Sequence, residues 1–171
     1  TIKNTLINAH HTEEGLAQNI AHQSEGSYIR ALDLLSQKPE DLQFEAWFIA
    51  WVRTAFQAKS NKQSINSLMA WSAEISKAGR EIQKQFLDYS LRFFRQAMLY
   101  NYGAKELVFI ELNDKSFKID NFAPFIDASN IAEISKEIEL ASYHIERNAN
   151  PKVVLTDLSI KLTRLLHLKK D

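Results

Sequence analysis

The chain has 171 residues, of which 45% are hydrophobic and 25% are charged, the usual balance of a globular protein. Lysine and arginine together number 21, as do aspartate and glutamate, so the formal net charge is zero. Because a chain that holds phosphates by itself normally carries a basic excess, this balance argues against direct nucleic-acid binding. The lack of cysteine excludes disulfides and thiolate metal sites and fits a cytoplasmic protein, and no apolar run of about 18 residues predicts a membrane span.

The pattern of roughly the first 36 residues predicts three short helices, too few to form a hydrophobic core by themselves. Residues 2–9 form an apolar-striped segment, and Thr12 is expected to cap the next helix, with Glu13 and Glu14 in its first turn. Gly26 is expected to end this second helix in the left-handed conformation. The third helix has an apolar side, made by Tyr28, Ala31, Leu32 and Leu35.

Pro39 is well placed to begin a fourth helix, whose apolar arc is too wide for a surface helix and must be covered on more than one side. That arc consists of Phe44, Trp47, Phe48, Trp51, Val52, Ala55 and Phe56. Trp47 and Trp51 lie one turn apart, so we expect them, with Trp71, in a core or subunit contact rather than in a ligand pocket. A less apolar helix follows around residues 65–75, and Gly79 separates it from a long helix that Gly103 closes.

Residues 104–126 show no clear period. The stretch KELVFIEL has the β-branched content of a strand, but no partner strand is visible elsewhere, and an isolated strand would leave its backbone groups unpaired. We therefore interpret this segment as helix or turn, with a short helical piece around Pro124.

Two clear helices end the chain, and the fold class predicted is all-α. Asn130 and Glu133 are expected to form a capping box at the start of the first. Its apolar seam consists of Ile131, Ile134, Ile138, Ala141 and Ile145. Pro151 begins the second helix. The stripe of that helix consists of Val154, Leu155, Leu158, Leu162 and Leu165.

The motifs that usually carry chemistry are missing from the sequence. It contains no GxxxxGK[ST] phosphate loop, no HExxH, no GxSxG and no glutamate followed by histidine three residues on. His10, His11 and His22 lie near one another but lack metal-ligand spacing, and His144 is interpreted as a boundary histidine rather than a catalytic base. We therefore predict no catalytic, cofactor-binding or metal-binding residue and no enzymatic activity for this chain.

Two stretches carry a resemblance to a known family, LAQNIAHQSEGSYIRALDLL and ASYHIERNANPKVVLTDLSIKLTRLL. They resemble the C-terminal half of bacterial clamp-loader subunits, and more narrowly the delta-prime family of DNA polymerase III; the HIERNANPK junction is similar to Bacteroidetes versions. The resemblance implies that residues 1–37 are the last part of an AAA+ lid domain and residues 38–171 a helical collar domain. It implies gamma/tau and delta subunits as partners, DNA contact only through the assembled complex, and no membrane contact.

The resemblance also bears on Arg30. ATP-hydrolysing AAA+ relatives carry a sensor arginine three residues after the glycine that corresponds to Gly26. Here that position is Ile29, and Arg30 comes one residue later, a rotation of about 100° around the helix. We therefore interpret Arg30 as a charge on the helix face. The arginine that delta-prime lends to its neighbour's ATP site belongs to an N-terminal domain, which we expect to precede Thr1.

Four arginines beside apolar stripes are our candidates for a subunit interface: Arg92, Arg95, Arg147 and Arg164. For Arg92 and Arg95, in LRFFRQ, an exposed face and inter-subunit ion pairing remain equally open. Two other identities also remain open. One is the collar of a gamma/tau-type ATPase subunit of the same machine, which the position of Arg30 disfavours. The other is a helical adaptor unrelated to replication.

Overall fold

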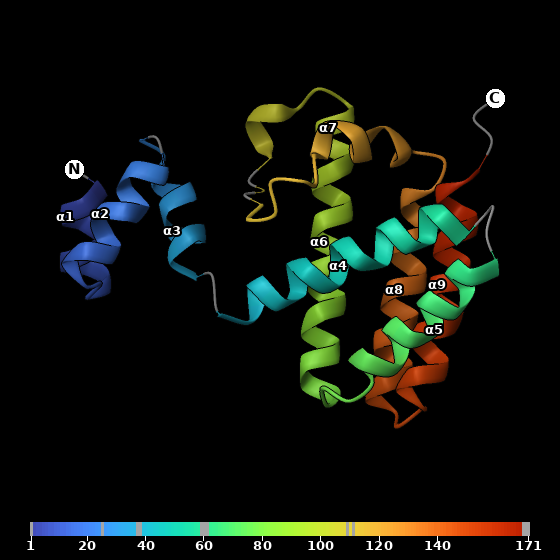
Figure 1. Ribbon diagram of the computed structural model, residues 1–171. Helices are drawn as coiled ribbons and strands as arrows, with labels where there is room; N and C mark the ends of the chain where they lie inside the picture. The colour runs from blue at the N-terminus through green and yellow to red at the C-terminus, as the bar shows by residue number, and fades with distance from the viewer. Residues whose placement is uncertain are drawn as a thin grey trace. The chain divides into compact units, whose positions relative to one another are not determined.

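The computed structural model describes residues 2–24, 26–36, 39–58, 62–108, 110 and 112–168, and all secondary structure in these ranges is helical (Figure 1). The predicted all-α class is confirmed. The chain divides into two compact units, Thr1–Asp41 and Leu42–Asp171, here called the smaller and the larger unit. Their identification as lid and collar stays a prediction. Among the described residues no helix has both the length and the apolar character that crossing a membrane requires.

The smaller unit consists of α1 (Ile2–His10), α2 (Glu14–Gln23) and α3 (Tyr28–Ser36), with α2 packed against the other two. Its small core is made by Leu6, Ala17, Ile20 and Ala31. Gly26 has a φ of 87°, the left-handed conformation predicted for it, in the turn between α2 and α3.

The expectation that Thr12 caps α2 is wrong. The helix begins at Glu14, and its first backbone hydrogen bond runs from the amide of Ala17 to the carbonyl of Glu13. Thr12 instead turns inward: its amide donates to the Leu6 carbonyl at 3.3 Å, and its buried hydroxyl has no hydrogen-bond partner. The threonine closes the end of α1 against the core rather than starting the next helix.

The larger unit is built on five long helices. They are α4 (Pro39–Ala58), which begins at the unit boundary, α5 (Lys62–Ile75), α6 (Arg80–Asn101), α8 (Ile131–Glu146) and α9 (Pro151–Leu166). Packing contacts place α8 between α6 and α9, and α9 between α8 and α5. Helix α4 crosses this row on one side (Figure 1). Pro39 and Pro151 begin their helices as predicted.

Aromatic side chains of α4 join it to the row. Trp51 is fully buried, stacks on Trp71 of α5 with ring centres 4.9 Å apart, and donates its indole N–H to the Ser159 hydroxyl of α9 at 2.9 Å. The Phe48 ring lies 4.2 Å from the Phe93 ring of α6. Trp71 donates to the carbonyl of Trp47 at 3.0 Å. The core interpretation of the three tryptophans is therefore confirmed.

The segment that follows α6 contains two 3₁₀ turns, η1 (Lys105–Leu107) and η2 (Ala123–Phe125), and the one-turn helix α7 (Ile119–Phe122). Helix or turn is thus the correct interpretation of its described part, residues 104–108, 110 and 112–126, where no strand occurs. The buried carboxylate of Glu45 on α4 holds this segment, accepting from the Asn113 amide at 3.1 Å and the Asp114 backbone N–H at 2.7 Å. Phe122 is buried against α4 and α6.

The predicted capping box at the start of α8 is wrong, although its isoleucine seam is confirmed as core. Asn130 occupies the N-cap position but makes no side-chain cap. Its amide N–H₂ donates to the carbonyls of Phe125 at 2.7 Å and Leu165 at 3.1 Å, and its oxygen accepts from Asp127 N–H at 3.0 Å. These hydrogen bonds engage the Asn130 side chain, so it does not cap α8. They join η2 to α9 instead, and Glu133 remains at the surface.

Replacing Asn130 with alanine is expected to lower the free energy of unfolding by about 2–3 kcal/mol, because the amide and carbonyls that it satisfies lose their partners. Glu133→Ala is the matched control and is expected to cost less than about 1 kcal/mol, since within the described ranges the Glu133 carboxylate pairs only with Lys136, at 3.3 Å on the surface. Urea denaturation of both variants measures the difference. Equal losses of unfolding free energy in the two variants would support the capping box and contradict the tertiary role of Asn130.

Candidate subunit interface

Ion pairs fix how α6, α8 and α9 lie beside one another. Arg95 and Lys84 of α6 pair with Glu139 and Glu146 of α8, at 3.6 and 3.4 Å. Because the higher number on α6 meets the lower number on α8, the two helices are antiparallel. Lys161 of α9 pairs at 2.8 Å with Glu137 on the other flank of α8. The three helices thus form a layer with α8 in the middle.

The core lies on one side of this layer. The seam of α8 and the residues Leu155, Leu158 and Leu162 of α9 are buried there. Helical geometry places the residues half a turn away on the opposite side, which we call the outer face. Its members are exposed: Arg92 on α6; Lys136, Leu140, Tyr143 and Arg147 on or just after α8; and Val153, Asp157, Ile160 and Arg164 on α9.

Large apolar side chains are part of the outer face. Leu140 is 38% exposed, Tyr143 52%, Val153 63% and Ile160 40%. Single exposed apolar residues are common on any protein, but these four stand on two adjoining helices. Such a group beside arginines is the usual composition of a protein-protein contact, in which aromatic and arginine side chains are enriched.

The structure brings the four predicted interface arginines to neighbouring helices of one layer. Arg92 and Arg164 are exposed, and neither has a partner within the described part of the chain. Arg95 pairs with Glu139, so it joins α6 to α8. The Arg147 guanidinium lies over the Tyr143 ring, 5.4 Å from its centre. Their role in binding a subunit stays a prediction.

Lys161 pairs with two acids at or near the outer face. Hydrogen bonds from its ammonium group to Glu137, and then to Asp157 at 2.9 Å, raise the pKa of Lys161 against the opposing effect of burial. The lysine therefore stays charged at neutral pH and binds both carboxylates. Sequence reasoning missed this cluster, although the spacing of Asp157 and Lys161, one helical turn apart, signals their pairing.

The other predicted positions show no convergent chemistry. His10 forms a hydrogen bond with the Tyr28 hydroxyl at 3.0 Å, and His144 is exposed beside Tyr143. The side chains of His22 and Arg30 lie outside the described residues, so the interpretation of Arg30 as a helix-face charge stays a prediction. No three acidic or histidine side chains within the described ranges gather closely enough to hold a metal ion.

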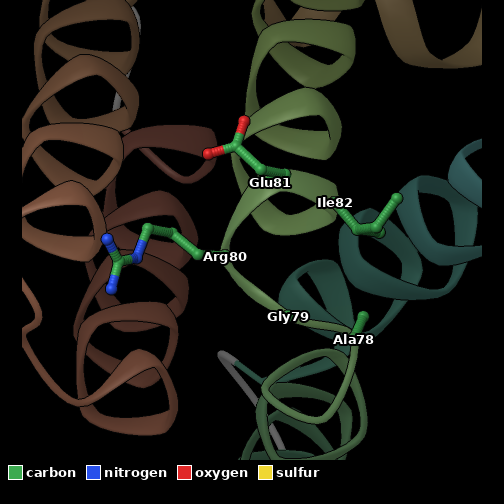
Figure 2. A pocket seen from close by; sticks show the side chains of 5 residues that line it. All are labelled: Ala78, Gly79, Arg80, Glu81 and Ile82. Carbon is green, nitrogen blue, oxygen red and sulfur yellow. The ribbon is translucent and has the colours of Figure 1, made fainter.

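An open hollow at the turn between α5 and α6 is lined by one continuous stretch, residues 78–82 (Figure 2). Arg80 points from it toward the neighbouring helices and donates to the Asn148 side chain, while Ile82 points away from Arg80. A second hollow is lined by residues between Ile110 and Asp120. There Asp114 accepts from the hydroxyl and amide of Ser116, which lowers its pKa. These polar groups are engaged in local structure, and the outer face remains the stronger candidate site.

Comparisons of the chain with protein-family models, with curated protein sequences and with solved structures found no match. The clamp-loader resemblance therefore rests on the two stretches quoted above and on the order of the parts.

Arg92→Ala and Arg164→Ala are each expected to change the free energy of unfolding by less than about 0.5 kcal/mol, because neither guanidinium has a partner in the described part of the chain. Ile138→Ala is the contrasting variant and is expected to cost about 2–5 kcal/mol, since Ile138 is 2% exposed in the core. Urea denaturation measures all three. A loss above about 1 kcal/mol for either arginine would show that the side chain serves the fold.

Proposed function

We propose that this chain is the C-terminal region of a cytoplasmic clamp-loader subunit of DNA polymerase III, of the delta-prime type. The observation that carries the proposal is the order of the two units. A three-helix unit contains the stretch that resembles the end of a lid domain, and a larger helical unit contains the stretch that resembles the end of a collar. This is the succession that the resemblance implies.

In this role the larger unit packs against the collars of gamma/tau and delta subunits and holds the ring together while the sliding clamp is loaded. A contact of standard size removes about 800 Å² per partner from water, so it needs an exposed surface with apolar side chains. The outer face supplies Tyr143, Val153 and Ile160 for burial. Unpaired arginines such as Arg164 supply planar donors for carboxylates of a neighbour.

The proposal assigns no reaction to this chain. ATP hydrolysis belongs to other subunits of the ring, and DNA is contacted through the assembled complex. Ile29 stands where hydrolysing relatives carry the sensor arginine, which supports a delta-prime rather than a gamma/tau identity.

Assembly with loader subunits tests the proposal. The natural protein that contains this chain is co-expressed with the gamma/tau and delta subunits of the same genome and purified through a tag on this protein. We expect all three to elute together in size-exclusion chromatography, because collar contacts are the main link between loader subunits. A folded protein that elutes alone would contradict the proposal and favour the unrelated helical adaptor.

Nucleotide binding separates the two loader identities. The natural protein is expected neither to bind fluorescent ATP analogues at micromolar concentration nor to release phosphate. The gamma/tau subunit of the same genome serves as the positive control. Saturable ATP binding with hydrolysis by the tested protein would identify it as a gamma/tau-type subunit instead.

A further inference from the structure

The outer sides of α8 and α9 carry the same residue spacing. Four positions at i, i+4, i+7 and i+11 share one side of a helix. On α8 and its C-cap these are Lys136, Leu140, Tyr143 and Arg147, and on α9 they are Val153, Asp157, Ile160 and Arg164. All eight side chains are exposed. The two helices pack against each other and are joined by the turn at residues 147–150, so the two stripes run side by side (Figure 1).

The ion pair between Glu137 and Lys161 shows that these two residues lie at the same level along the axes of α8 and α9. An α-helix rises 1.5 Å per residue, so Arg147 lies about 15 Å from that level toward the turn. Arg164 lies about 5 Å from it in the opposite direction. The Cα atoms of the two arginines therefore stand near opposite ends of the pair, about 20 Å apart along its axis, with those of Tyr143 and Ile160 between them.

The charges that remain unpaired on this surface are positive. Asp157 and Glu137 are both paired with Lys161, and Glu133 lies 3.3 Å from Lys136. Arg164 has no partner in the described part of the chain, and Arg147 has only the Tyr143 ring. A second copy of this chain docked on the same surface would bring arginines against arginines, which costs binding energy. The complementary partner carries carboxylates.

We propose that the outer side of α8 and α9 binds a single amphipathic helix of a neighbouring subunit, with an acidic residue near each end and apolar residues between them. A span of about 20 Å corresponds to about four turns of helix, so the two acids stand about 14 residues apart, a spacing that keeps both on the same side of the helix. Each acid accepts a pair of N–H bonds from Arg147 or Arg164. The proposal rests on the proposed function for the identity of the neighbour, whereas the surface itself determines the chemistry.

The apolar middle supplies most of the buried area in this arrangement. Tyr143 and Ile160 lie between the arginines and present their side chains to the helix, as anchors surrounded by polar groups do in other interfaces. The arginines fix its direction and register, because charge pairs at a rim contribute specificity more than affinity.

Two stapled helical peptides of about 18 residues test this pairing without any loader subunit. Both have the same apolar stripe; one has glutamates and the other lysines at two positions about 14 residues apart, on the same side of the helix as the stripe. Binding is measured by fluorescence anisotropy against the wild-type chain and against the double variant Arg147→Glu/Arg164→Glu. We expect wild type to prefer the glutamate peptide at least about tenfold, and the variant to prefer the lysine peptide.

Lys62→Glu/Lys77→Glu is the matched control, since it makes the same change in net charge at exposed positions on α5 and the turn after it. We expect it to keep the wild-type preference. Reversed preference in the arginine variant also shows that it is folded, because an unfolded chain would bind neither peptide. Equal binding of both peptides by wild type, or the same loss in both double variants, would overturn the proposal. Failure of the proposed function has a different signature, namely the absence of loader subunits in the co-purified complex.

Discussion

The larger unit depends on the contact that Trp51 makes with two helices at once. Its ring stacks on Trp71 of α5, and its indole N–H, which has no access to water, is satisfied by the Ser159 hydroxyl of α9. Large aromatic side chains of this kind bury much area but need a partner for each polar atom. Ser159 meets that need and, being small, also lets α5 and α9 approach closely.

This contact also determines which surface stays free. Because α4 crosses one side of the row (Figure 1), the aromatic core forms there, and residues on the opposite side of α8 and α9, such as Tyr143 and Ile160, are exposed. Ion pairs such as Arg95 with Glu139 lie between the helices and leave the apolar and arginine positions uncovered. The surface that we assign to a partner therefore follows from the same packing that builds the core.

Periodicity was sufficient to predict the helices, the start of α9 at Pro151 and the buried seam of α8 around Ile138, because these depend on residues within a few turns of each other. Periodicity failed where a group distant in the sequence binds a side chain that was predicted to cap its own helix. Asn130 has the sequence context of a cap, but the Leu165 carbonyl, brought near by the fold, takes its amide. Asn150, in a similar context, does cap α9, accepting from Lys152 and Val153.

The candidate site, too, could be predicted from the sequence only in part. Arg147 and Arg164 could be singled out from the sequence because each stands beside the apolar stripe of its own helix. Their position at opposite ends of one surface could not be predicted, since the register of the two helices depends on the pairing of Glu137 with Lys161.

Polar groups in this chain serve two separate purposes. Several of those in the interior satisfy backbone carbonyls: the hydroxyls of Ser72 and Ser90 donate to carbonyls of their own helices, and the Gln83 amide donates to carbonyls at the end of α5. The second purpose is to place charge at the surface. The formal net charge of zero does not reveal it, because the charges cancel over the whole chain but not locally. Lys161 pairs with both Asp157 and Glu137, while the outer side of α8 and α9 keeps unpaired arginines, and we propose that these local positive charges give the chain a specific surface for a neighbour.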